Sequence, residues 1–232
     1  LEVVASEVSR IADEYAAHVA PRIKSCFFPS EYESFAAKSD IQKRQERADV
    51  VFPRELANLF VDEFTQVGYV SRVGFPVYNP RSMITPGYQG TLGYGYATAL
   101  GVKVAHPDKP VVSVNGDGGF MYTMPEIATA VHHNINLVAI VFSDGAYGNV
   151  LRMQRELHDG KIIASQFTNP DFVKLTESFG ALGLRAKTPN ELRIALEQGF
   201  SANRPTIIEV PVKAFPEPFE LLRPTATRGT KG

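Results

Sequence analysis

Along most of the chain, short apolar runs rich in β-branched residues alternate with longer segments whose apolar residues recur every three or four positions. The short runs are typical of buried strands, and the longer segments of helices that cover a sheet. Strands are predicted at 68–73, 110–115, 136–142, 181–185 and 205–212. Helices are predicted at 1–20, 53–64, 97–104, from a capping box at 123–126 onward, 150–157, 171–179 and 188–200. The alternation predicts an α/β fold: a doubly wound, mainly parallel sheet of five to six strands with helices on both faces.

Local signals set several of these boundaries. Capping boxes are predicted at Thr123–Glu126 and Thr188–Glu191. Asn169-Pro-Asp171 is predicted to cap the helix that ends near Phe179, and Gly180 to stop it. The segment 161–167 is predicted to be mobile or irregular.

Three regions are expected along the chain. Residues 1–49 are predicted to be a helical connector from a preceding domain, since their second half is strongly polar. Residues 50–213 are expected to form the α/β domain. Residues 214–232 are rich in Pro, Arg and Thr, which predicts a tail or a partner-binding arm.

Composition excludes several classes of function. The 232 residues carry a net charge of −1, so there is no electrostatic case for binding nucleic acid or a membrane surface. The single cysteine, Cys26, excludes an internal disulfide and a cysteine-rich metal site. No apolar run approaches the roughly 20 residues that span a bilayer, and no secretory signal is visible. A cytoplasmic location is predicted.

The densest chemistry lies between Gly116 and Asn149, where two predicted strands end in acidic turns, Gly-Asp-Gly-Gly and Ser-Asp-Gly-Ala. Parallel strands end at the same edge of a sheet, so Asp117 and Asp144 are expected to point toward one site. Two carboxylates beside a diphosphate suit Mg²⁺. Gly118 and Gly119 are expected to let the backbone approach a phosphate at a helix N-terminus. The alternative is that both aspartates are ordinary turn and cap residues.

Taken together, the two turns resemble the diphosphate-binding domain of thiamine-diphosphate-dependent enzymes, over roughly residues 50–212. The resemblance implies thiamine diphosphate and Mg²⁺ as cofactors. It implies metal ligation by Asp117, by the Asp144 side chain and by the Ala146 carbonyl. Ser143-Asp144 departs from the Asn-Asn of many members.

Further contacts to the cofactor follow from the same resemblance. The segment Gly87–Gly95 is similar to the one that holds the aminopyrimidine ring in acetolactate-synthase-like members, which places Gly90, Thr91 and Leu92 against it. The diphosphate is expected to lie against Gly116, Asp117, Gly118, Gly119, Tyr147, Gly148 and Asn149. Arg72-Val73-Gly74 is interpreted as replacing an acidic residue that many relatives carry after the first strand. His132 and His133, late in a crossover helix, are interpreted as structural.

The resemblance implies a carbon–carbon lyase or carboligase acting on 2-keto acids or aldehydes. No catalytic residue is expected in this chain, because the activating glutamate of the family belongs to a separate pyrimidine-binding domain. That domain is expected from the same polypeptide or another subunit, within a homo-oligomer, a dimer or tetramer. Three alternatives stay open: the diphosphate-binding subunit of a split 2-keto-acid decarboxylase, a non-catalytic cofactor-binding relative, and a nicotinamide-binding protein. The last lacks a GxGxxG after its first strand.

Overall fold

The computed structural model describes residues 59–74, 77 and 79–213, which all belong to one compact unit, Ala48–Ala214. The predicted connector and helix in residues 1–49, and the tail from 214 to 232, lie outside the described residues. The predicted domain limits stay a prediction.

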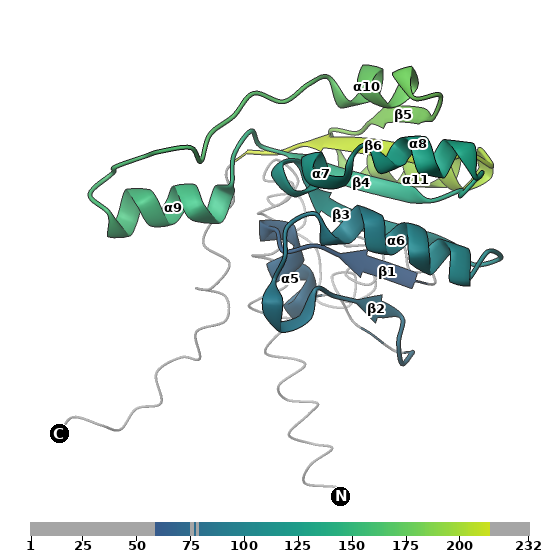
Figure 1. Ribbon diagram of the computed structural model, residues 1–232, viewed down its shortest axis with the longest axis horizontal. Helices are drawn as coiled ribbons and strands as arrows, with labels where there is room; N and C mark the ends of the chain where they lie inside the picture. The colour runs from purple at the N-terminus through teal and green to yellow at the C-terminus, as the bar shows by residue number, and fades with distance from the viewer. Residues whose placement is uncertain (1–58, 75–76, 78, 214–232) are drawn as a thin grey trace, which may run out of the picture. The chain divides into compact units, whose positions relative to one another are not determined.

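The described part of the chain forms a six-stranded sheet in which every pair of neighbouring strands is parallel (Figure 1). The order across the sheet is β2-β1-β3-β4-β6-β5. The strands are β1 (Leu59–Asp62), β2 (Met83–Ile84), β3 (Val111–Gly116), β4 (Val138–Ser143), β5 (Leu182–Arg185) and β6 (Thr206–Pro211). Because all strands run the same way, their carboxyl ends share one edge.

Helices cover both faces of this sheet, which confirms the predicted α/β class. Side chains of α6, α7, α8 and α10 join one apolar cluster with the odd-numbered positions of the central strands, such as Val61 and Val141. On the opposite face, α11 places Gly199 against Thr206 and Val138. The helices are α5 (Gln66–Gly74), α6 (Tyr94–Ala105), α7 (Asp117–Thr123), α8 (Glu126–His132), α9 (Gly148–Leu157), α10 (Phe172–Ser178) and α11 (Pro189–Ser201), with a 3-10 turn, η2 (Gly87–Gln89).

Most predicted elements of the second half are confirmed within two or three residues. The Asp171 side chain accepts from the N–H groups of Val173 and Lys174 and so caps α10, while Gly180, at φ +86°, follows its end. Thr188 caps α11 by accepting from Glu191 N–H. The segment 161–167 is irregular, as predicted.

For the first two elements of the described part of the chain, the sequence predicted a helix followed by a strand, whereas the structure has a strand followed by a helix. The predicted helix 53–64 contains strand β1, and the predicted strand 68–73 lies inside helix α5. Leu59–Asp62 is buried at every position, and a short apolar run of this kind does not distinguish strand from helix by its periodicity. The helix signal that was missed is Thr65, whose hydroxyl accepts from Gly68 N–H and caps α5.

The capping box predicted at Thr123–Glu126 is also wrong. Helix α7 begins at Asp117, directly after β3, and Pro125 precedes the separate helix α8. Thr123 ends α7 instead of opening a helix, and its hydroxyl donates to the Gly93 carbonyl (3.3 Å). Among the described residues, no helix combines the length and the apolar character needed to cross a bilayer.

One aromatic residue joins α7 to the rest of the apolar cluster. Phe120 is fully buried, and its ring meets Tyr96 of α6 (centroids 5.2 Å apart) and Phe172 of α10 (5.9 Å) edge to face. We predict that Phe120→Ala lowers the free energy of unfolding by about 3–5 kcal/mol, because it leaves a cavity among three helices.

Denaturant unfolding of the full chain measures this loss. Met121→Ala is the matched control, since Met121 is the next residue of α7 and is 39% exposed. Equal losses for the two variants would contradict the importance of the Phe120 contacts.

Candidate functional site

The carboxylate of Asp117 ties three segments together at the carboxyl edge of the sheet. Its Oδ2 accepts from the N–H groups of Asp144 (2.9 Å) and Gly145 (2.7 Å) and from Asn169 Nδ2 (2.6 Å). Its Oδ1 accepts from Gly118 N–H (2.8 Å). Oδ2 is thus saturated by three donors, whereas Oδ1 keeps a lone pair for a further ligand.

The second acidic turn closes around Asp144. Asp144 Oδ1 accepts from Ala146 N–H (3.1 Å), which places the Ala146 backbone beside this carboxylate. Burial and, to a smaller extent, the nearby charge of Asp117 together raise the pKa of Asp144 from 3.8 to about 6. The structure therefore brings Asp117, Asp144 and Ala146 together, as the sequence predicted.

The glycines after Asp117 make room for protein groups. A Cβ at Gly118 would lie 2.6 Å from the Tyr147 ring, and one at Gly119 would overlap the carboxyl group of Glu63. Gly116 lies beside Thr65, where a Cβ would come within 3.3 Å of its side chain. Close packing within the protein thus constrains positions 118 and 119 to small residues, and the approach of their backbone to a phosphate stays a prediction.

The loop Gly90–Gly93 packs on helix α7, so the two predicted half-sites are neighbours. A Cβ at Gly93 would lie 2.9 Å from Tyr122 Cβ, and the Gly93 carbonyl accepts from Thr123. Gly90 is left-handed (φ +57°) and lies on the ring of Phe64. Thr91 and Leu92, at the tip of this loop, are exposed.

The third predicted segment begins α9. The Tyr147 ring stacks edge to face on Phe167 (5.0 Å), and its hydroxyl lies 3.4 Å from that of Tyr122. A Cβ at Gly148 would lie 3.2 Å from Asp144 Oδ2. Asn149 Oδ1 accepts from Arg152 within α9 (3.1 Å). The rings of His132 and His133 meet edge to face at the end of α8 (centroids 4.7 Å apart).

Sequence reasoning missed three polar residues of this site: Glu63, Gln66 and Asn169. Glu63 directly follows β1, whereas Arg72-Val73-Gly74 lies at the end of helix α5, so the interpretation that these three residues follow the first strand is wrong. Gln66 Nε2 contacts Gly148, and Asn169 binds Asp117. The Thr65 cap could have revealed the first two, but no signal marked Asn169 beyond the helix cap two residues later.

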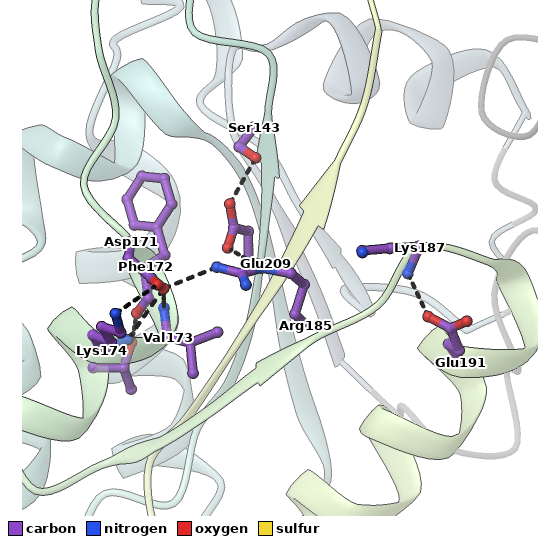
Figure 2. Close-up of polar contacts among 10 residues, drawn as sticks. Ser143, Asp171, Phe172, Val173, Lys174, Arg185, Lys187, Glu191 and Glu209 are labelled. Carbon is purple, nitrogen blue, oxygen red and sulfur yellow. Dashed lines mark hydrogen bonds and ion pairs between the residues drawn. The ribbon is translucent and has the colours of Figure 1, made fainter.

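A polar chain extends from the second acidic turn along the sheet edge (Figure 2). Ser143 donates to Glu209 Oε1 (3.0 Å), and Arg185 Nε donates to Glu209 Oε2 (2.8 Å). Arg185 Nη2 also donates to Asp171 Oδ1 (2.8 Å), the cap of α10. Ser143 stands where many family members have the first Asn of the Asn-Asn pair. The structure anchors it to β6 through Glu209 and, through Arg185, to β5.

The geometry defines a class of protein: a parallel α/β domain whose neighbouring strand ends hold two acidic turns at one point, suited to bind a diphosphate through a cation. A family model described as "Thiamine pyrophosphate enzyme, C-terminal TPP binding domain" matches residues 65–210. The chain belongs to this family. Thiamine diphosphate is accordingly its cofactor, as predicted, and Mg²⁺ is the usual partner metal in the family.

Curated relatives point to the same group. The chain is 34% identical over 185 residues to the mitochondrial acetolactate synthase catalytic subunit of Aspergillus candidus, covering 74% of this chain and 26% of that protein. It is 40% identical over 138 residues to acetolactate synthase of Bacillus subtilis (60% and 24%). It is 36% identical over 141 residues to 2-hydroxyacyl-CoA lyase of Arabidopsis thaliana (59% and 25%). The chain thus spans about a quarter of these relatives.

Among solved structures, the chain is similar to the thiamine diphosphate-dependent 4-hydroxybenzoylformate decarboxylase of Rhodococcus jostii. The TM-score is 0.63 at 28% identity, over 69% of this chain and 30% of that one. The match confirms the α/β fold and agrees with an acetolactate-synthase-like group that includes decarboxylases and lyases.

The raised pKa of Asp144 has a consequence for stability. The folded chain holds this proton more tightly than the unfolded chain, so the contribution of Asp144 to stability falls as pH rises from 3.8 to about 6 and stays low above it. We predict that Asp144→Asn stabilises the cation-free chain at pH 7–8, by on the order of 1 kcal/mol after solvent screening.

Denaturant unfolding in the presence of a chelator at pH 4 and pH 7.5 measures the effect. The gain should be present at pH 7.5 and absent at pH 4. Asp108→Asn, at an exposed carboxylate, should change neither value. A gain of the same size at both pH values would contradict the electrostatic cause.

The chain of polar contacts through Arg185 also gives a prediction. Glu209 has a side chain only 10% exposed, and Arg185→Ala would leave its carboxylate without the guanidinium. We expect a loss of about 1–3 kcal/mol in the free energy of unfolding.

Lys174→Ala is the control, because Lys174 also faces Asp171 but is 82% exposed at 3.9 Å, and its loss should be close to zero. The double variant Arg185→Met/Glu209→Met should recover part of the loss, because no unpaired charge remains. Equal losses in Arg185→Ala and Lys174→Ala would refute the role of the ion pair between Arg185 and Glu209.

Proposed function

We propose that this chain supplies the diphosphate- and metal-binding half of the active site of a thiamine-diphosphate- and Mg²⁺-dependent carbon–carbon lyase or carboligase acting on 2-keto acids. The observation that carries the proposal is the joining of the two acidic turns through Asp117 Oδ2, in a chain of this family. The proposed domain for this role is residues 50–213.

The described residues fit a hydrated cation. Asp117 Oδ1 has a lone pair to spare, and Asp144 is a carboxylate whose charge is costly in this environment. Buried side-chain oxygens without a hydrogen-bond partner surround the turns, among them Asn169 Oδ1 and Gln66 Oε1. The described residues hold no cluster of three or more His, Cys, Asp or Glu able to bind a metal, so phosphate oxygens and the Ala146 carbonyl would complete the ligand set.

Each segment then has one task. Asp117, Asp144 and the Ala146 carbonyl would hold the cation, while the backbone at the N-termini of α7 and α9, at Gly116–Gly119 and Tyr147–Asn149, would lie against the diphosphate. Gly90, Thr91 and Leu92 would contact the aminopyrimidine ring. The bound cofactor supplies the nucleophile and the electron sink for chemistry at a carbonyl carbon.

The proposal requires a pyrimidine-binding domain, with the activating glutamate, from the same polypeptide or another subunit. Exposed apolar side chains lie on the loop and helix beside the half-site, including Tyr88, Leu92 and Tyr122. Such a group of apolar residues is typical of a surface that another domain covers. A homo-oligomer would supply that cover across a subunit interface.

The names of the relatives suggest the substrates. Acetolactate synthases and a 2-hydroxyacyl-CoA lyase support cleavage or formation of a bond next to a carbonyl group. Turnover of the complete assembly with pyruvate, glyoxylate and aldehydes would identify the donor and the acceptor. Absence of turnover with intact cofactor binding would favour the non-catalytic alternative.

We predict that Asp117→Ala and Asp144→Ala each weaken Mg²⁺-dependent binding of thiamine diphosphate to the full chain by about 10–100-fold or more, because each removes a ligand of the cation. Titration calorimetry with and without Mg²⁺ measures the loss. Asp108→Ala, at an exposed aspartate, is the control and should bind as the unaltered chain does. Unchanged affinity in both site variants would refute the assignment of the metal ligands.

A further inference from the structure

Glu63 is a fully buried residue that directly follows β1. It lies between the Gly90–Gly93 loop and the Gly116–Gly119 turn. Its side chain reaches the first residues of α6 on one side and the first turn of α7 on the other. The proposed ligation of the cation and the diphosphate gives it no task.

On the side of α6, Glu63 Oε1 accepts a hydrogen bond from Gly93 N–H, the first residue after the tip of the Gly90–Leu92 loop. The Glu63 Cβ also packs on Gly95, where an added Cβ would lie 3.0 Å away. The next residue, Phe64, places its ring under Gly90, within 2.7–2.9 Å of the position of a Cβ there. Glu63 and Phe64 thus form the floor of the loop.

On the side of α7, the Glu63 carboxyl group occupies the space where Gly119 lacks a side chain. Gly119 has no left-handed backbone that would call for glycine, so the space itself explains the residue. Thr123 closes the arrangement from the other end of α7 by donating to the Gly93 carbonyl. The distance between the loop and α7 is therefore set by one side chain at one end and by one hydrogen bond at the other.

Glu63 Oε2 is buried and has no hydrogen-bond partner. Burial raises the pKa of Glu63 to about 7, so a neutral carboxyl group is readily available in this position. A buried polar atom without a partner is costly, and an apolar side chain of similar size would avoid that cost. An apolar side chain, however, would lack an acceptor for Gly93 N–H and the shape of the carboxyl group.

We propose that Glu63 is a positioning residue that fixes the Gly90–Gly93 loop against the Gly116–Gly119 turn, and so sets the separation of the aminopyrimidine and diphosphate half-sites. This inference rests on the proposed function, in which the Gly90–Gly93 loop and the Gly116–Gly119 turn contact the same cofactor. A cofactor that engages both half-sites depends on this separation, whereas a ligand that engages only the diphosphate half does not.

The test compares two probes on the full chain by titration calorimetry with Mg²⁺: thiamine diphosphate, which spans both half-sites, and inorganic pyrophosphate, which occupies only one. Glu63→Ala should weaken binding of thiamine diphosphate by about tenfold or more and binding of pyrophosphate by less than about threefold. Asp117→Ala should weaken both. Thermal unfolding of each variant shows that the fold is retained.

Glu63→Gln tests the physical basis. The amide keeps the size of the carboxyl group and an oxygen that can accept from Gly93 N–H, so it should restore the affinity for thiamine diphosphate to within about threefold of the unaltered chain. Glu191→Gln is the matched control, since Glu191 also accepts from a backbone N–H, that of Lys187, at the start of α11 (Figure 2). It should change neither affinity.

Two results would overturn the inference while leaving the proposed function intact. One is an equal loss for both probes in Glu63→Ala, and the other is a Glu63→Gln variant as impaired as Glu63→Ala, which would show that the charge acts and not the position. If the unaltered chain binds neither probe, the proposed function itself fails. Should Glu63→Ala not fold, Phe64→Leu removes the other half of the loop floor and must show the same selective loss for thiamine diphosphate.

Discussion

The structure of the site depends on a single carboxylate oxygen, Asp117 Oδ2. Three donors converge on it: two backbone N–H groups from the turn after β4 and the amide of Asn169, which lies 52 residues further along the chain. Hydrogen bonds to an ionised acceptor are the strong ones, and this group accepts three while almost fully buried. The acidic turns are therefore joined within the protein itself, and the second oxygen, which accepts only from Gly118 N–H, keeps a lone pair.

The sequence was informative wherever a local rule decided the structure. Strands β3, β4 and β6 are mainly apolar runs that are buried except at their last residue, and Asp171 and Thr188 are caps with their own hydrogen bonds, so each could be predicted from a few neighbouring residues. The reversal of β1 and α5 shows the limit. Three apolar residues and a buried Asp62 fit either element, and only the Thr65 cap, a weak signal alone, favours a helix that begins at Gln66.

Long-range contacts account for what the sequence could not show. Asp117 and Asp144 were found because the parallel sheet brings consecutive strand ends together, a rule that needs no coordinates. Glu63 and Asn169 reach the same place from β1 and from the segment before α10, and no spacing in the sequence relates them to Asp117. Gly118 and Gly119 were predicted to let the backbone approach a phosphate, and the structure adds that Tyr147 and Glu63 occupy the space where their side chains would lie.

Three acidic residues are concentrated at this edge of the sheet. Glu63, Asp117 and Asp144 directly follow the ends of β1, β3 and β4. Burial raises the pKa values of both Glu63 and Asp144. Helix N-termini and backbone N–H groups offset part of this charge, because their dipoles favour anions there. A cation bound beside Asp117 and Asp144, as proposed, would offset the rest, so the charge that is costly without a cation would favour a metal-bound diphosphate. Glu63, which has no place in that ligand set, can remain neutral and serve the packing of the loop instead.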